Sequence, residues 1–368
     1  MTVAAPGRSG DRAMTSVSVV IPCYKYGHFL EDVVTSVLDD QPGVDVRALI
    51  IDDASPDDSA DMARKIAARD PRVEVIVHTA NQGNIATFNE GLLEWADGDY
   101  CALVSADDRL TPGALRRARD LLDAHPGAGF VYGHAVWFTH GASPPAARER
   151  VRGWSVWPGP WWLERLFRQG ENPITSPEVV MRTSLLKRVG GFDPRMPHAA
   201  DMELWMRLAA NAEVGFIRGA DQAYYRLHQE NMRKGYDALA DLRERRLVYE
   251  TVLDYCGERL PEARAWSGDV HRKLGREALW AAGRAYDRGR LRQSELARRL
   301  LGAGATGEER DVGDLVAFAR DCWPEVSSLP LYNTLESHQD IGPRALGYMF
   351  AEKVQWWLRR RSWKYRGI

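Results

Sequence analysis

Two pairs of adjacent aspartates are the residues best suited to chemistry in this 368-residue chain. Asp52-Asp53 ends an apolar run at 46–52, and Asp107-Asp108 follows another at 99–105. Like charges this close repel each other unless a cation or a hydrogen-bonding ligand offsets them. A solvated turn or a helix cap would explain one such pair, but two pairs that both follow β-rich runs favour a ligand site.

The segments around these pairs alternate between strand and helix patterns. Near-continuous apolar runs are typical of strands buried on both faces of a parallel sheet. Ligands bind outside the carboxyl ends of the strands in open sheets of this kind, which is where both aspartate pairs lie. The predicted fold class is α/β, with a mainly parallel, Rossmann-like sheet and helices on both faces. We expect strands at 16–22, 46–52, 73–78 and 99–105, and helices at 28–40, 56–68, 84–96 and 112–125.

The pattern changes along the chain and indicates three segments. Residues 1–15 mix small, polar and charged types and are predicted to form a flexible leader. Residues 16–231 carry the α/β pattern, with a loop expected at 141–160 and a helix at 200–210. Only helical patterns follow, so 232–368 is predicted to be a helical C-terminal domain.

Composition excludes several classes of protein. Hydrophobic residues make up 45% and charged residues 27%, as in ordinary soluble globular proteins. Lys+Arg 49 against Asp+Glu 51 gives a net charge of −2, so nucleic acid is not an expected partner. The four cysteines are far apart and form no CxxC pair, which favours reduced thiols and a cytoplasmic location. No apolar run approaches the ~20 residues needed to cross a bilayer.

Seven short motifs stand in a specific order along the first two thirds of the chain. They are Val17–Tyr24, Ile51–Asp57, Asn81–Asn84, Val104–Asp108, Gly190–Asp193, Ala200–Leu204 and Tyr225–His228. Each motif is weak evidence by itself, but the ordered series resembles the family-2 glycosyltransferases, which are inverting enzymes with the GT-A nucleotide-sugar-binding fold. The resemblance covers residues 16–231. It implies transfer of a hexosyl or related sugar from a nucleotide-diphosphate donor to an acceptor hydroxyl.

The resemblance assigns nucleotide binding to the ends of the first strands. Pro22 and Tyr24 would frame the base, with the Tyr24 ring available for stacking. Asp53 would accept a hydrogen bond from a ring N–H, which favours a uridine or thymidine donor. Gly83 would lie where the backbone approaches the nucleotide closely. The alternatives are an amphipathic rim residue for Tyr24 and a helix-terminal charge for Asp53.

The same resemblance implies a metal site for Mn²⁺ or Mg²⁺. Asp107 would face the ribose or the metal shell, Asp108 would be the direct ligand, and His228 would complete the shell. Both ions are hard and prefer oxygen ligands that they can share with phosphate. Ser105 stands where many members of the family carry a first aspartate, which weakens the expected site. Without the motif, His228 would be interpreted as a structural residue.

A general base is expected at the start of the 200–210 helix. Asp201 matches the aspartate of the family's Glu-Asp signature, with Ala200 in place of the glutamate. Inversion needs one base that deprotonates the acceptor hydroxyl as it attacks the anomeric carbon. The alternatives are that Asp201 only caps its helix, and that Glu203 is the base.

Two tryptophan-rich segments suggest contacts beyond the donor. The 154–162 segment is interpreted either as an acceptor lid or as a surface loop whose tryptophans pack under the sheet or at a homodimer contact. The segment 352–366 combines basic and aromatic residues, as interfacial helices do, so it predicts either peripheral membrane contact or a packed C-terminal helix. Expected acceptors are carbohydrates, lipid-linked sugars or small metabolites.

Two other functions compete with glycosyl transfer. A sugar-1-phosphate nucleotidyltransferase shares a similar α/β start, but it opens with a glycine-rich, basic loop where this chain has Pro22–His28. A nucleotide-sugar-binding scaffold without turnover would fit the serine at position 105. The combination of Asp108, Asp201 and His228 favours catalysis over a scaffold.

Overall fold

The computed structural model describes residues 15–229, 231, 237–257, 259–293, 308–337 and 343–368. The predicted leader therefore lies outside the described residues, except for Thr15. The described chain forms two compact units. Unit 1 takes in Met1–Leu163, Asn172–Asn231 and Lys364–Ile368, and unit 2 takes in Glu164–Glu171 and Met232–Trp363.

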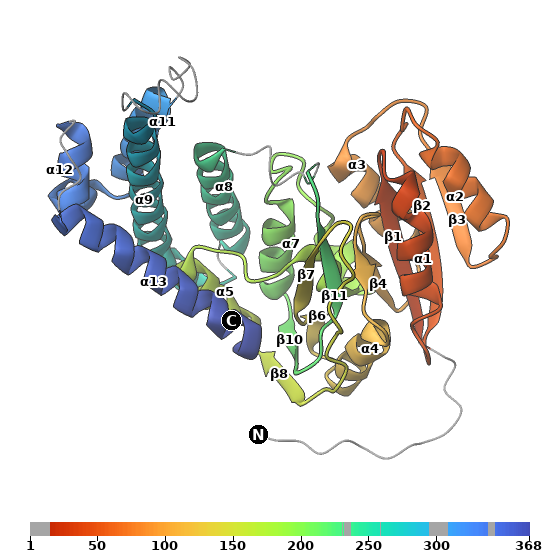
Figure 1. Ribbon diagram of the computed structural model, residues 1–368. Helices are drawn as coiled ribbons and strands as arrows, with labels where there is room; N and C mark the ends of the chain where they lie inside the picture. The colour runs from red at the N-terminus through yellow and green to blue at the C-terminus, as the bar shows by residue number, and fades with distance from the viewer. Residues whose placement is uncertain (1–14, 230, 232–236, 258, 294–307, 338–342) are drawn as a thin grey trace. The chain divides into compact units, whose positions relative to one another are not determined.

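The larger sheet of unit 1 contains the predicted parallel strands. Strand β1 pairs in parallel with both β2 and β4, so the carboxyl ends of the three strands lie at one edge (Figure 1). The register places Cys23 opposite Asp52, which brings the turns after β1 and β2 together. In sheet order the strands are β3 (Val73–Val77), β2 (Asp45–Asp52), β1 (Ser16–Cys23), β4 (Tyr100–Leu103), β9 (Val180–Arg182), β6 (Ala128–Tyr132), β10 (Glu213–Arg218) and β8 (Gly153–Trp157).

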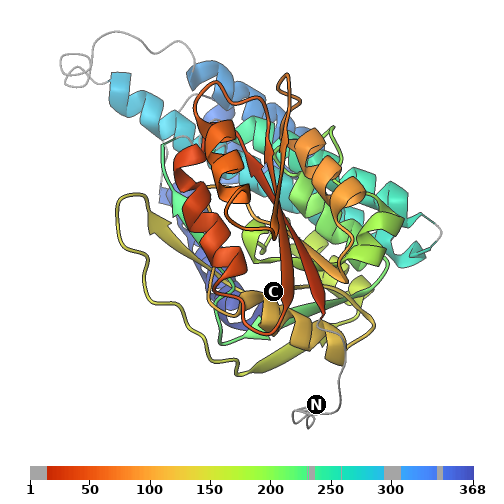
Figure 2. The same cartoon turned by 90° about the vertical axis from the view of Figure 1, so that its right-hand side faces the viewer.

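Helices cover both faces of this sheet (Figures 1 and 2). Successive side chains of a strand point to opposite faces, so Val19 and Ile21 enter one core while Val20 enters the other. The first core also contains the apolar sides of α1 (Leu30–Leu38), α2 (Ser59–Ala67) and α4 (Ala114–Ala124). On the other face, α3 (Asn84–Asn89) continues into the π-helical turn η2 (Glu90–Trp95), and Gly91 of that turn lies against Val20. Farther along the sheet, Trp162 of α5 (Gly159–Gln169) and Trp205 of α7 (Ala200–Ala209) pack on Phe130.

A small second sheet completes the edge where the strands end. Its order is β5 (Arg109–Leu110), β11 (Ala223–Leu227) and β7 (Ala135–Thr139). Strand β5 starts directly after Asp108 and pairs with β11, so the chain around His228 comes back to the end of β4. The short 3-10 helix η3 (Ser176–Glu178) packs against β4, β5 and β11. The remaining elements of unit 1 are η1 (Gly27–Phe29) and α6 (Thr183–Val189).

Unit 2 is helical. The buried Arg245 guanidinium lies 3.0 Å from Asp241 and 2.8 Å from Glu277, and it donates to the carbonyl of Gly170 (2.7 Å). These contacts join α8, α9 and the residue after α5. The described helices are α8 (Ala238–Cys256), η5 (Pro261–Trp266), α9 (Ser267–Gln293), α11 (Glu308–Cys322), η6 (Pro324–Ser328), α12 (Pro330–Glu336) and α13 (Pro343–Arg366).

The predicted α/β class with a mainly parallel sheet and a helical C-terminal region is confirmed, but several element boundaries were wrong. The predicted helix 56–68 begins only at Ser59, because Asp57 accepts the backbone N–H of Ser59 (3.1 Å) and holds a turn. Helix α4 begins at Ala114, because Gly113 takes a left-handed conformation (φ 70°). The loop expected at 141–160 contains β8, which pairs antiparallel with β10 along its whole length at the sheet edge.

Two further sequence observations have structural counterparts. No helix in the described ranges is both long and apolar enough to cross a membrane. All four cysteines are buried free thiols, and burial raises the pKa of Cys23 and of Cys101 to about 12. These thiols therefore stay protonated at neutral pH and are poor nucleophiles.

The close packing of η2 on the sheet gives a stability prediction. A Cβ at Gly91 would lie 2.4 Å from a methyl carbon of Val20, so Gly91→Ala must displace the strand or the turn. We expect a loss of about 1–3 kcal/mol in the free energy of unfolding, measured by urea denaturation. The matched control is Gly268→Ala in α9, where a Cβ would meet nothing within 4 Å. A Gly91→Ala protein as stable as this control would contradict the packing.

Candidate functional site

The Asp53 carboxylate organises the loop that follows β3. It accepts the backbone N–H groups of Gln82 (2.7 Å) and Gly83 (2.9 Å) and lies 2.7 Å from Nδ1 of His78. Burial alone would raise the pKa of Asp53, but these donors outweigh it and hold the pKa below its ordinary value. Gly83 has φ 87°, a left-handed conformation that favours glycine, and its N–H points at the carboxylate. The predicted nucleotide residues Asp53 and Gly83 are therefore in direct contact.

His78 lies buried between two carboxylates. Its Nδ1 is 2.7 Å from Asp53, and its Nε2 is 2.7 Å from Glu90 at the start of η2. Burial lowers the pKa of His78, but the two carboxylates raise it more, so the pKa lies above the ordinary value of 6.5. A protonated imidazole can donate to both acids at once. The hydrogen-bonded series Asp53–His78–Glu90 thus connects the loop after β3 to the start of η2.

The turns after β1 and β2 are held in strained conformations. Lys25 (φ 64°) and Ala54 (φ 55°) are the non-glycine residues with positive φ among those the structure describes. The Lys25 N–H donates to Oγ of Ser55 (3.0 Å), so the two turns lock each other. Such strain persists only where surrounding structure enforces it, and it is concentrated at functional sites. Tyr24, the residue before Lys25, is 41% exposed, and the Lys25 ammonium lies 5.0 Å from the centre of its ring.

Asp107 and Asp108 lie buried at the end of β4, against β11. Nε2 of His228 is 2.9 Å from a carboxylate oxygen of Asp107, and the backbone N–H of Arg226 donates to Asp108 (3.0 Å). The Arg226 side chain donates to the carbonyl of Asp107 (2.8 Å). The N–H of Ala106 in turn donates to the carbonyl of Pro22 (3.3 Å). The structure therefore brings Pro22, Asp107, Asp108 and His228 to one edge of the sheet.

The donor set at this edge has the chemistry of a hard-metal site. Burial, and then the neighbouring Asp107 carboxylate, raise the pKa of Asp108 well above its ordinary value. A cation beside the pair would relieve this repulsion, and two carboxylates with an imidazole suit Mn²⁺ or Mg²⁺. Within the described ranges, no three His, Cys, Asp or Glu side chains are already gathered as a ligand group, and His228 is hydrogen-bonded to Asp107. The residues therefore fit such an ion in type.

Asp201 lies at the start of α7 and is held by Ser176, the first residue of η3, and by Asn172 from the segment before it. Oγ of Ser176 donates to one carboxylate oxygen (2.8 Å), and Nδ2 of Asn172 lies 3.4 Å from the same oxygen. The other oxygen accepts the N–H of Met202 (2.6 Å). Burial raises the pKa of Asp201 above its ordinary value despite these donors. A carboxylate with a raised pKa accepts a proton more readily near neutral pH.

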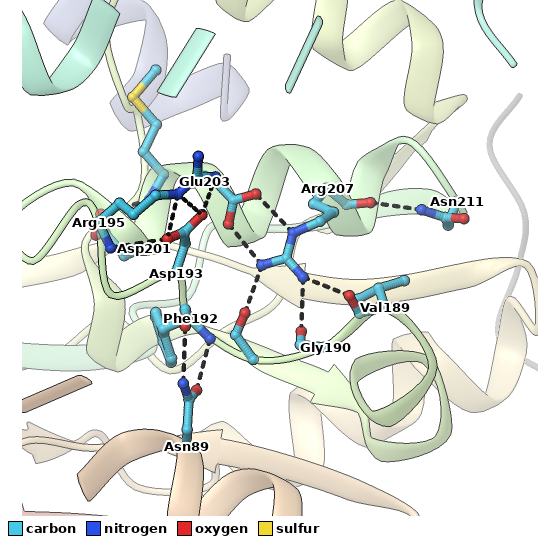
Figure 3. A network of polar contacts seen from close by, with 12 residues as sticks. Asn89, Val189, Gly190, Phe192, Asp193, Arg195, Asp201, Glu203, Arg207 and Asn211 are labelled. Atoms are coloured by element: carbon cyan, nitrogen blue, oxygen red, sulfur yellow. Dashed lines mark hydrogen bonds and ion pairs between the residues drawn. The ribbon is translucent and has the colours of Figure 1, made fainter. Parts of the chain in front are cut away.

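Glu203, the alternative base, has a structural role instead (Figure 3). Both its oxygens accept hydrogen bonds from the Arg207 guanidinium, each at 2.7 Å, and its side chain is buried. Arg207 also donates to the carbonyls of residues 189, 190 and 191, so it shapes the Gly190-Gly191 turn. The Asn89 side chain accepts the backbone N–H of Phe192 (2.7 Å) and donates to the carbonyl of the same residue (2.9 Å). Both oxygens of the Glu203 carboxylate are thus engaged by Arg207.

Sequence reasoning missed several residues that hold this site. His78 is the last residue of the predicted strand 73–78 and Arg226 lies within the Tyr225–His228 motif, but neither of them nor Ser176 was assigned a role. Arg226 could have been noticed, because it precedes His228 by two residues in a strand and an arginine there must find a counter-charge. The partners of His78 and Ser176 are distant in sequence, so no local pattern reveals them.

The His78 contacts give a pH-dependent stability prediction. Because the pKa of His78 is raised on folding, its contribution is complete below pH 6.5 and is lost as the pH rises through the folded-state value. His78→Gln should therefore destabilise the protein most at acidic pH, and the difference from wild type should shrink towards alkaline pH. Thermal unfolding of both proteins across this range measures it. The control is His125→Gln, and a difference independent of pH would refute the charged pairing.

Comparisons with known proteins agree with this architecture. Residues 18–187 match the family model described as Glycosyl transferase family 2. The structure resembles that of S. aureus TarS 1-349 in complex with UDP-GlcNAc, with a TM-score of 0.56 and 17% identity, over 91% of this chain and 89% of that chain. It also resembles the mannosyltransferase PcManGT from Pyrobaculum calidifontis in complex with GDP-Man and Mn²⁺, with a TM-score of 0.53 and 18% identity, over 85% and 88% of the two chains. Both likenesses concern the fold.

Curated relatives share the same part of the chain. An uncharacterized glycosyltransferase of Nostoc sp. is 31% identical over 223 residues, 58% of this chain and 66% of the relative. The putative teichuronic acid biosynthesis glycosyltransferase TuaG of Bacillus subtilis is 32% identical over 106 residues, 29% of this chain and 41% of that protein. A Sinorhizobium fredii protein is 30% identical over 192 residues, 52% of this chain but only 20% of its own length. The chain thus spans less than two thirds of each of these relatives. Residues 18–187 of this chain therefore form a domain of glycosyl transferase family 2.

Proposed function

We propose that this protein is an inverting glycosyltransferase that moves a sugar from a nucleotide-diphosphate donor to an acceptor hydroxyl. The observation that carries the proposal is the buried Asp107-Asp108 pair, with His228 2.9 Å from Asp107, at the carboxyl ends of the strands of a family-2 domain. Ligands of open α/β sheets bind at that edge. Asp53, Gly83 and Tyr24 lie at the ends of neighbouring strands and would receive the nucleotide.

Asp53 would contact the base while it holds its own loop. A carboxylate has about four lone-pair sites, and three are used by His78, Gln82 and Gly83. The remaining site suits a single ring N–H, as in uracil or thymine. The exposed Tyr24 ring and Pro22 would frame the same base. The TarS structure contains UDP-GlcNAc, which agrees with a uridine donor, whereas PcManGT contains GDP-Man.

Asp108 and His228 would hold a divalent ion, with Asp107 beside it. When bound, the ion neutralises the charge that develops on the diphosphate as the sugar leaves. The Mn²⁺ in the PcManGT complex supports this type of ion. The buried carboxylate pair is well suited to the task, because its mutual repulsion makes a cation the favoured partner.

Asp201 would act as the general base. Its carboxylate would take the proton of the acceptor hydroxyl while that oxygen forms a bond to the anomeric carbon and the bond to the diphosphate oxygen breaks. Attack from the face opposite the diphosphate inverts the configuration. Ser176 and Asn172 would keep the carboxylate oriented, and its raised pKa favours proton uptake. The commitment of Glu203 to Arg207 leaves Asp201 as the better base on this helix.

The metal assignment predicts a specific loss of binding. With Mn²⁺ present, Asp108→Asn should lower the affinity for UDP by about tenfold or more, because one ligand charge is lost, and chelator should abolish turnover. Isothermal titration with UDP, with and without Mn²⁺, measures the first effect. Asp97→Asn, which alters an exposed ion pair with Arg47, is the matched control. Full activity in chelator would refute the metal assignment, and binding without any turnover would indicate a scaffold.

The base assignment predicts a loss of rate without a loss of donor binding. Asp201→Asn should reduce turnover of a productive donor by about 10²–10⁴-fold while the affinity for its nucleoside diphosphate is unchanged. Release of nucleoside diphosphate from UDP-GlcNAc and GDP-Man, with Mn²⁺, provides the assay. Glu203→Gln should behave in the opposite way, with a lower melting temperature and a nearly normal rate per folded molecule, because it disturbs a buried ion pair. If Glu203→Gln abolished turnover and Asp201→Asn did not, the roles would be reversed.

A further inference from the structure

Helix α13 has one face that packs inside unit 2. Ala345, Glu352, Arg359 and Trp363 recur at intervals of seven, seven and four residues, which places them on one side of a helix. Glu352 accepts a hydrogen bond from Nε of Arg276 (2.8 Å), Arg359 donates to Glu171 (2.8 Å), and Nε1 of Trp363 donates to Gln169 (3.0 Å). The orientation of the helix about its own axis is therefore set by specific polar contacts.

The opposite face of α13 is apolar and exposed. Phe350 is 69% exposed, Trp357 is 54% exposed and Leu346 is 51% exposed. Val354, Trp356, Leu358 and Tyr365 are exposed as well, so seven of the ten exposed large hydrophobic residues of the described chain lie on this helix. Most of them recur at three- or four-residue steps and form a stripe. A contiguous exposed stripe of this kind marks an interaction surface, because a monomer gains nothing by exposing it to water.

Positive charge accompanies the apolar stripe. Lys353, Arg360, Arg361, Lys364 and Arg366 are exposed, and no acidic residue follows Glu352. The cations lie beside aromatic rings: Arg360 over Trp356 (4.6 Å), Arg361 over Trp357 (5.6 Å) and Lys364 over Tyr365 (6.0 Å). The one carboxylate of this region, Glu352, is buried beneath the helix by Arg276 and Lys273. The exposed face of α13 therefore combines apolar side chains with basic ones and presents no carboxylate.

We propose that α13 is a docking surface for an anionic lipid membrane. A helix of 24 residues, about 36 Å long, would lie along the surface, with Phe350 and Trp357 in the headgroup boundary and the basic residues near the lipid phosphates. Long basic side chains can reach the phosphates while their stems cover apolar surface. A second copy of the chain is the less suitable occupant, because pairing two such helices would bring like charges together with no carboxylate to offset them.

Vesicle flotation of the full chain tests this surface. Wild type should float with vesicles of phosphatidylcholine and phosphatidylserine, float poorly with phosphatidylcholine alone, and dissociate as salt is raised. The double variant Phe350→Ser/Trp357→Ser should lower the bound fraction at least about tenfold, since it removes two interfacial anchors. Arg361→Gln/Lys364→Gln should weaken binding to the anionic vesicles only. Brominated phosphatidylcholine should quench tryptophan fluorescence in wild type and not in the first double variant.

Two control variants match these changes elsewhere in the chain. Arg64→Gln/Lys65→Gln removes the same charge from the exposed side of α2, and Trp161→Ser removes an exposed tryptophan (40% exposed) from α5. Both should float like wild type. If wild type does not float, the proposal is overturned. Sedimentation equilibrium then tells whether the stripe serves a second copy, because the Phe350→Ser/Trp357→Ser protein would be monomeric where wild type is a dimer. Circular dichroism of each variant verifies that α13 remains folded.

Discussion

Burying two neighbouring carboxylates is the constraint around which the strand-end edge of unit 1 is built. Removing Asp107 and Asp108 from water is costly unless donors or a counter-charge compensate. Arg226 provides both, through its backbone N–H on Asp108 and its guanidinium on the carbonyl of Asp107. Its position in β11 means that the small sheet must close against the end of β4. His228, two residues later, is brought to Asp107 by the same strand.

Asp53, directly after strand β2, is another buried carboxylate at this edge of the sheet whose burial must be compensated. Here the compensation comes from the loop itself, whose two backbone N–H groups and His78 satisfy the carboxylate. Because Glu90 secures the far side of His78, the loop is anchored to η2, which is packed tightly on Val20. The geometry of the loop that we propose binds the nucleotide thus depends on a buried contact in the core beneath it.

Helix α7 shows how two acids of one turn acquire different roles. Glu203 faces the core and is neutralised by Arg207, so it stabilises the Gly190-Gly191 turn. Asp201 faces hydroxyl and amide groups, which orient it without supplying a cation. Its raised pKa follows from burial, which outweighs the hydrogen-bond donors and the charge of the neighbouring His198. Both side chains are carboxylic acids, so only their surroundings distinguish the proposed base, Asp201, from the ion-paired Glu203.

The amino-acid sequence by itself determined the α/β class, the mainly parallel sheet and the candidate residues at the strand ends. Apolar periodicity and short motifs are local properties, so they can be recognised without the tertiary structure. Helix starts were less predictable, since Asp57 and Gly113 act through turn geometry that competes with the helical pattern. The β8 strand at 153–157 was missed because an edge strand is defined by its partner, β10, about sixty residues away. Only the tertiary structure decided that Glu203 pairs with Arg207, that His78 bridges Asp53 and Glu90, and that Trp356 and Trp357 of α13 are exposed while Trp363 is packed. Each of these depends on contacts between distant segments, which the order of residues does not record.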